Sequence, residues 1–174
     1  PKDPRGPLYM GMVHEADGKA ADAERDYREA IRLGPGTKEP LQALVRLLSK
    51  QGKQAAALQT LDALITREAK NPFPAFLKGE VLASIGRAPE AVAAYTIAQQ
   101  RTPRWWLAYR GLANAMASKG DFAGAVKLLR GALTNVDEPL PLRAELAAML
   151  ERGGQSDAAI AEYEQLYRAN PASG

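Results

Sequence analysis

The chain has 174 residues, of which 46% are hydrophobic and 25% charged, close to the averages of folded soluble domains. Its net charge of +3 is small and its charges are interspersed, so the composition does not indicate a nucleic-acid partner. Cysteine is absent, which excludes disulfides and thiolate chemistry, and no apolar run approaches the roughly 18 residues of a membrane-spanning helix, so we expect no direct membrane insertion.

Glycines recur along the chain at a constant interval. Each glycine of this set stands 34 residues after the previous one: Gly18, Gly52, Gly86, Gly120 and Gly154. An alanine follows each of them by five residues: Ala23, Ala57, Ala91, Ala125 and Ala159. A constant period of this length is the sequence signature of a repeat architecture.

Each period reads as two amphipathic helices around its glycine. In the fourth period, Leu112 and Met116 before the glycine, and Val126, Leu129 and Leu133 after it, fall at the three- and four-residue steps of a helix. The glycine would end the first helix in a left-handed conformation, and the alanine would let the second helix approach closely. The predicted helices span residues 7–16, 20–33, 38–51, 54–69, 74–85, 88–101, 104–119, 122–135, 139–152 and 156–169.

Helix ends carry further signals. Asp121 and Ser156 follow their glycines and are expected to cap the second helices of their repeats by accepting backbone N–H bonds. The prolines Pro35, Pro103 and Pro171 are expected to stop a second helix before the next repeat begins.

These columns resemble the tetratricopeptide repeat family, most closely from Ala108 to Met116 and through Gly120-Asp121-Phe122. The resemblance implies an all-α, right-handed superhelical solenoid of five helical hairpins that forms one domain over residues 1–174. The repeats would span residues 4–37, 38–71, 72–105, 106–139 and 140–173. The sequence departs from the family pattern at Lys78, in an apolar column, and at Ala69 and Asp137, where a proline is usual.

Few residues suggest chemistry. The single histidine, His14, falls in a column of leucine and methionine, so we expect a packed imidazole, and it has no second histidine or cysteine for a metal site. Gly34-Pro35-Gly36 reads as a turn, because proline lacks the N–H that a phosphate cradle needs. The sequence therefore predicts a protein that is not an enzyme and that needs no metal or cofactor.

In the family that the chain resembles, the first helix of each repeat lines a concave groove for a protein or peptide. Aromatic and arginine side chains beside apolar surface are typical of binding hot spots. The alternative for the two phenylalanines is that they pack between repeats without a ligand. The predicted partner-binding residues are Gln42, Arg46, Phe73, Phe76, Glu80, Leu107, Arg110 and Asn114.

One binding mode of the family is argued against by the residues. Chaperone adaptors of this type hold a C-terminal carboxylate with Lys, Arg and Asn side chains on three successive first helices. Arg110 and Asn114 would start such a set, but Glu145 stands where the next asparagine belongs and would repel a carboxylate. Trp105 and Trp106 are interpreted either as a wedge between repeats or as an aromatic part of a partner site.

Both ends of the sequence suggest a longer solenoid. The chain opens on Pro1 without an initiating methionine, and it stops after Pro171, where a sixth repeat would begin. Tyr163, Leu166 and Tyr167 would face a following helix, so we expect a fragment of a longer chain or self-association through this last helix.

The predicted function is a non-catalytic scaffold that binds a protein or peptide in the groove. The alternatives are a self-assembling structural solenoid and a regulatory arm of a larger enzyme. The Ala- and Leu-rich style is similar to that of bacterial repeat proteins, including those of exopolysaccharide export of the PEP-CTERM-associated type. That similarity implies a secretion or polysaccharide-export setting, with the bacterial periplasm and the cytoplasm both left open.

Overall fold

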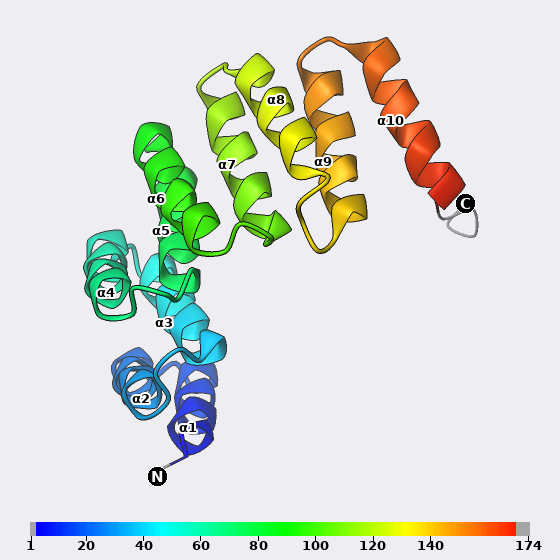
Figure 1. Ribbon diagram of the computed structural model, residues 1–174. Helices are drawn as coiled ribbons and strands as arrows, with labels where there is room; N and C mark the ends of the chain where they lie inside the picture. Colours follow the sequence, from blue (N-terminus) through cyan, green and yellow to red (C-terminus); the bar gives the residue numbers. More distant parts are fainter. Residues whose placement is uncertain (1–2, 170–174) are drawn as a thin grey trace. The chain divides into compact units, whose positions relative to one another are not determined.

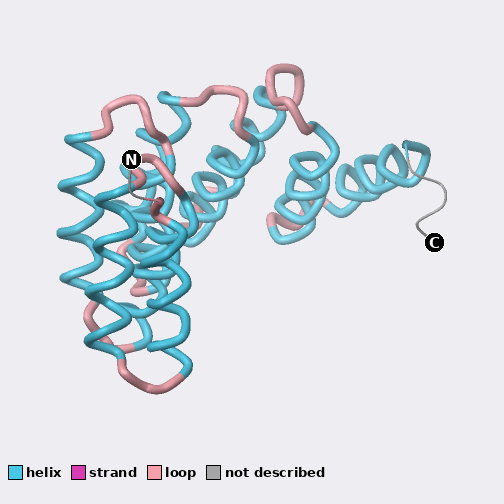
Figure 2. Tube along the Cα trace, turned by 90° about the horizontal axis from the view of Figure 1, so that it is seen from below, coloured by secondary structure: helices cyan, strands magenta, loops and turns pink. Residues whose placement is uncertain are grey.

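The computed structural model describes residues 3–169, and all of the regular secondary structure in that range is helical. Figures 1 and 2 show helices joined by short loops. The helices are α1 (Arg5–Ala16), α2 (Ala20–Leu33), α3 (Lys38–Lys50), α4 (Gln54–Arg67), α5 (Phe73–Ser84), α6 (Ala88–Arg101), α7 (Trp106–Ser118), α8 (Phe122–Ala132), α9 (Pro139–Arg152) and α10 (Ser156–Ala169).

The chain forms two compact units that meet within α5, the first ending at Val81 and the second beginning at Leu82. In the first unit α1, α2, α3 and α4 pack in succession, and α1 also contacts α3. In the second unit α6 to α10 pack in succession, and α7 also contacts α9. Each unit thus has the packing expected of helical hairpins, in which first helices of adjacent repeats touch.

The periodic glycines turn the chain between the two helices of each hairpin. All five have positive φ, from 72° at Gly52 to 84° at Gly120, and no heavy atom would meet a Cβ at any of them. Glycine is therefore required by conformation rather than by space. The residue after the glycine donates back to the first helix, as from the Lys19 nitrogen to the His14 oxygen at 2.8 Å, and this closes a Schellman-type turn.

The alanines five residues after the glycines lie at the helix crossings. The first four are fully buried and Ala159 nearly so, as their small size predicts. Around Ala125, the side chains of Leu129, Leu146 and Leu150 form one apolar cluster from α8 and α9. The core of each unit is thus built from the columns that the repeat defines.

Two of the three departures from the repeat pattern, Lys78 and Asp137, are accommodated by local ion pairs. Lys78 is half-buried and its Nζ lies 2.5 Å from Oδ1 of Asp62, which supplies the charge partner that an apolar column lacks. At the turn after α8, the Asp137 nitrogen donates to the Arg104 oxygen at 3.1 Å, and the two side chains form an ion pair.

Most helix limits agree with the prediction, and the exceptions have local causes. Helix α8 ends at Ala132, before the predicted residue 135, in a turn that buries Val136. Asp121 caps α8 as predicted, accepting from the Gly124 nitrogen at 2.9 Å. The prediction for Ser156 was wrong: this residue is the first of α10, and the Gln155 oxygen accepts the first helical bond.

Two further predictions concern the end of the last helix and insertion into a membrane. Pro171, expected to stop the last helix, lies outside the described residues. Over residues 3–169, none of the helices has the length and apolar character needed to cross a membrane.

Candidate protein-binding groove

A groove of about 540 Å³ lies between α1 and α3 in the first unit. Tyr9 and Met12 line it from α1, and Glu39, Gln42 and Arg46 line it from α3. Gln42 and Arg46 belong to the partner-binding residues predicted from the repeat register. We call this surface the α1–α3 groove.

Two large apolar side chains of the groove face solvent. Tyr9 is 61% exposed and Met12 is 51% exposed. The positions one repeat later hold Ala43, which is buried, and Arg46, which is exposed and charged. The first repeat therefore presents apolar area where the second repeat presents a small or a cationic residue.

A network centred on Glu15 adjoins the groove through Arg46, which belongs to both. Its carboxylate accepts from the Tyr27 hydroxyl at 2.8 Å and from Nη2 of Arg46 at 2.9 Å. Nζ of Lys50 lies 3.2 Å from its other oxygen. A second hollow of about 320 Å³, lined by Met12, Glu15, Arg46 and Lys50, adjoins this network.

The network shifts the pKa of both of its acids. Burial is the largest influence on Glu15 and raises its pKa, but the bonds from Tyr27, Arg46 and Lys50 together outweigh it and leave the pKa below its ordinary value. Burial, followed by the bond to Glu15, raises the pKa of Tyr27 to about 12. At neutral pH the network therefore holds an ionised Glu15 carboxylate and a neutral Tyr27 phenol.

This arrangement suits an extended peptide. The phenol ring and thioether offer contact area for an apolar side chain, while Gln42 and Arg46 offer donors for backbone carbonyls or a carboxylate. A cavity of this size is within the usual range of ligand sites, about 300–1,000 Å³.

The other predicted residues of the first unit contribute differently. Phe73 and Phe76 are only 8% and 7% exposed, and their rings stack with centroids 6.3 Å apart. Nζ of Lys38 lies 5.7 Å from the centre of the Phe73 ring. Little of either ring is available to a ligand, as the packing alternative expects, whereas Glu80 is exposed.

In the second unit, the predicted residues lie on α7. Leu107 is half-buried, and the Arg110 guanidinium stands 5.2 Å above the ring of Trp106. Nε of Arg110 lies 4.0 Å from Oε1 of Glu145 on α9. Because this carboxylate faces the arginine, the pair supports the argument against a carboxylate clamp.

Asn114 completes this face of α7. Its Oδ1 accepts from Nη1 of Arg152 at 3.1 Å, and its amide nitrogen donates to the Arg110 oxygen. The polar groups of this face are thus held by neighbours within the second unit. Trp105 and Trp106 are both half-buried, so each retains some exposed ring area.

Tyr9 and Met12 were not among the predicted site residues. Met12 stands 34 positions before Arg46 and so shares its column. Applying the repeat register to the first hairpin identifies it. Tyr9 carries no such signal, because its column is buried in the next repeat at Ala43 and in the one after at Leu77.

Groups with catalytic or metal-binding potential were also located. Nδ1 of His14 lies 2.7 Å from Oδ2 of Asp26, and both side chains are half-buried between α1 and α2. The pair ties the first hairpin together, so the imidazole is packed as expected. Within residues 3–169, no three His, Asp or Glu side chains gather closely enough to hold a metal ion.

Antiparallel helical hairpins with a 34-residue period and an exposed groove define the class of helical-repeat proteins. The particular family follows from sequence comparison: a family model described as "Tetratricopeptide repeat" matches residues 42–104 and 76–138. These segments together span more than half of the chain, which therefore belongs to the tetratricopeptide repeat family. Repeats of this family serve in general as protein–protein interaction scaffolds. No curated protein matches the sequence of the chain.

Solved structures share the fold. A thermophilic TPR protein of Thermus thermophilus is 22% identical, with 98% of this chain and 93% of that chain covered and a TM-score of 0.68. MamA of Desulfovibrio magneticus RS-1 is 17% identical, with 98% and 96% covered and a TM-score of 0.68. TPR-like repeats assigned to a kinesin light chain of Podosopora anserina are 18% identical, with 98% and 97% covered and a TM-score of 0.69. At these identities the likeness concerns the fold alone.

Proposed function

We propose that this chain is a non-catalytic scaffold that binds an extended segment of a partner protein in the α1–α3 groove. The observation that carries the proposal is the exposure of Tyr9 and Met12 beside Gln42 and Arg46 in one hollow. Exposed apolar area of this kind is costly in water unless a partner covers it. Tyrosine and arginine are also the residue types that dominate binding hot spots.

The charge pattern of the groove favours an extended backbone over a single anion. Arg46 and Lys50 already share the Glu15 carboxylate, and Glu39 adds a further negative charge at the rim. A partner that brings carbonyl oxygens and one apolar side chain would use the amide of Gln42 and the Tyr9 ring without opposing these carboxylates.

We extend the proposal to the face of α7 in the second unit. Leu107, Arg110 and Asn114 occupy the same register of a first helix, and Arg110 with Trp106 offers a cation–π surface. This face would bind a partner independently of the α1–α3 groove.

The test is partner capture followed by affinity measurement. The triple variant Tyr9→Ala, Met12→Ala and Arg46→Ala should bind a captured partner at least about tenfold more weakly than wild type, because two anchors and a donor are removed. A matched control that removes exposed apolar and arginine side chains outside this groove and outside α10, Ile85→Ala, Leu140→Ala and Arg130→Ala, should change the affinity by less than about twofold. Equal capture by the groove variant and wild type would refute the assignment to this groove.

The proposal also includes the assembly in which this scaffold works. A bacterial secretion or polysaccharide-export assembly rests on the style of the sequence, and a regulatory arm of a larger enzyme is the competing role. Co-purification from a native source, followed by identification of the bound chains, separates the two.

A second candidate function, self-association through α10, is favoured by one comparison between repeats. Tyr163 is 42% exposed, whereas its counterparts Tyr27, Leu61, Tyr95 and Leu129 are buried. The face that is covered in the four earlier repeats is thus open on α10 within the described residues. A second copy of the chain would bury it.

Light scattering over a range of concentrations tests this candidate. Wild type should gain mass as the concentration rises, and Tyr163→Glu together with Tyr167→Glu should remain monomeric because two charges would have to be buried. A wild type that stays monomeric at every concentration would exclude self-association through α10.

A further inference from the structure

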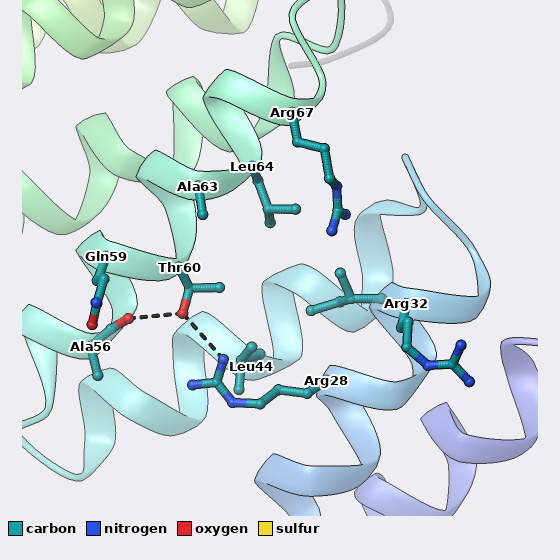
Figure 3. Close-up of a pocket in the computed structure, with 10 residues that line it drawn as sticks. Arg28, Arg32, Leu44, Ala56, Gln59, Thr60, Ala63, Leu64 and Arg67 are labelled. Atoms are coloured by element: carbon teal, nitrogen blue, oxygen red, sulfur yellow. Dashed lines mark hydrogen bonds between the residues drawn. The ribbon is translucent and has the colours of Figure 1, made fainter.

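A second hollow of the first unit lies on different helices from the α1–α3 groove. It has a volume of about 480 Å³ and is lined by α2 and α4, with Leu44 of α3 contributing to its base (Figure 3). We call it the α2–α4 pocket. No predicted groove residue lines it.

Part of the lining of this pocket is apolar. It consists of Ile31 of α2, Leu44 of α3 and Leu64 of α4, with Ala56 beside them. Leu44 and Leu64 are buried, so this part of the pocket is held by the core and stays in place when a ligand arrives. A hollow of this kind suits one large apolar side chain.

The charged residues that line the pocket are all arginines. Arg28 and Arg32 come from α2 and Arg67 from α4, and no carboxylate is among the lining residues. In Figure 3, Arg67 reaches down from α4 toward the opening, while Arg28 lies across from it with Nη1 3.4 Å from the Thr60 hydroxyl. Arg32 stands at the edge with its head group turned outward. The pocket therefore joins an apolar base to a cationic rim.

Carboxylates outside the lining residues pair with these arginines. Nη2 of Arg28 lies 3.0 Å from Glu24 on the same helix, and Nη2 of Arg67 lies 2.8 Å from the adjacent Glu68. The arginine side of each pair is still largely exposed, at 45% and 54%, and ion pairs at a protein surface are weak. A guanidinium has five N–H donors, so each arginine can hold a ligand carboxylate in addition to its present partner.

We propose that the α2–α4 pocket binds an acidic segment of a partner protein that carries a large apolar side chain between carboxylates. The apolar side chain packs against the partly exposed Ile31, Ala56 and Ala63, above the buried Leu44 and Leu64, and the flanking carboxylates meet Arg28 and Arg67. Desolvation of the ligand over an apolar base strengthens these charge-assisted bonds relative to exposed pairs. The site is separate from the α1–α3 groove and does not depend on it.

The test uses a short fluorescein-labelled peptide of alternating Glu and Leu residues around a central Phe, titrated with the full chain and followed by fluorescence anisotropy. Binding should weaken about tenfold for each arginine in Arg28→Gln and Arg67→Gln, since a hydrogen bond to a charged group is lost each time. The matched control, Arg25→Gln with Arg130→Gln, removes the same charge from exposed arginines that do not line the pocket. It should bind within about twofold of wild type.

A second variant tests the apolar base without changing charge. Ala63 is exposed at the mouth of the pocket, so Ala63→Phe should fold as wild type while filling the space and abolishing peptide binding. Circular dichroism verifies the fold of each variant. A peptide in which Ser replaces Leu and Phe should bind at least about tenfold more weakly, because the apolar contact is removed.

Three results would overturn the inference. The first is a wild type that does not bind the peptide, and the second is a double Gln variant that binds as well as its control. The third is full displacement of the peptide by millimolar inorganic phosphate alone, which would indicate a simple anion site. Loss of binding in Arg46→Gln but not in Arg28→Gln with Arg67→Gln would place the peptide in the α1–α3 groove. That result is a case of the second one, and it would support the proposed function.

Discussion

The Tyr27 hydroxyl donates to the Glu15 carboxylate at 2.8 Å and thereby ties α2 to α1. Glu15 also accepts from Arg46 and Lys50 on α3, so a single carboxylate links the first two hairpins beside the α1–α3 groove. These contacts therefore hold Arg46, which lines the groove, against the first hairpin.

Acid should weaken this link. The pKa of Glu15 is below its ordinary value in the folded chain, so its contribution to stability is present above about pH 4.5 and is lost as the pH falls through the lowered pKa. Glu15→Gln should reduce the free energy of unfolding by about 1 kcal/mol at pH 7. Urea unfolding should show this difference shrinking at pH 3. The control Glu164→Gln, in an exposed pair on α10, should cost less than about 0.5 kcal/mol at either pH.

High pH should also weaken the link between α1 and α2, through deprotonation of Tyr27. The pKa of Tyr27 is raised to about 12 in the folded chain, so its contribution is complete below pH 10 and is lost as the pH rises from 10 to about 12. Tyr27→Phe should cost about 1–2 kcal/mol at pH 7, because it removes a hydrogen bond to a charged group. Thermal unfolding of the two proteins should converge at high pH. A constant difference up to pH 12 would contradict the raised pKa.

The turn glycines should resist substitution for conformational reasons alone. Gly120 has a φ of 84° and open space around a Cβ, so Gly120→Ala should cost about 1–2 kcal/mol. Gly131 lies in α8, likewise with nothing near a Cβ, so Gly131→Ala should stabilise by up to about 1 kcal/mol. Denaturant unfolding measures both. Equal effects at the two sites would contradict the role assigned to the left-handed conformation.

The alanine column should be sensitive to added volume. Ala125 is fully buried between helices, so Ala125→Leu should destabilise by about 1–3 kcal/mol through overpacking. Ala123 lies two residues earlier on the exposed side of α8, so Ala123→Leu should stay within about 0.5 kcal/mol of wild type. The melting temperatures of the two variants, measured at the same pH, test whether the Ala125 position is overpacked by leucine.

Among the helices with a described cap residue, only α8 is capped by a side chain, that of Asp121. The contribution of this cap can therefore be measured by removing it and by adding one elsewhere. Asp121→Ala should cost about 0.5–2 kcal/mol because the Gly124 nitrogen loses its acceptor. Gln155 occupies the same column in the last repeat, so Gln155→Asp should stabilise α10 by about 0.5–1 kcal/mol. Hydrogen exchange of the first turn of α8 and of α10 measures each effect. Unchanged protection in both would refute the capping assignment.

The candidate site was only partly predictable from sequence. Gln42 and Arg46 follow from the repeat register, because a register determines which side of a helix a residue occupies. The phenylalanines Phe73 and Phe76 lie on the predicted side of α5, yet they are buried, since exposure depends on the neighbouring helices rather than on the position within one helix. The same dependence left Tyr9 exposed although its column is buried in the following repeat.

The sequence by itself determined the repeat, the helices and the turns, because these depend on neighbouring residues. A glycine at Gly18 or Gly120 turns the chain wherever it occurs, and a small residue such as Ala125 is needed wherever two helices cross closely. The tertiary structure decided which apolar side chains face solvent and which hollows form. The α2–α4 pocket brings Arg28 of one hairpin beside Arg67 of the next, and a relationship of this kind arises only once the hairpins have packed.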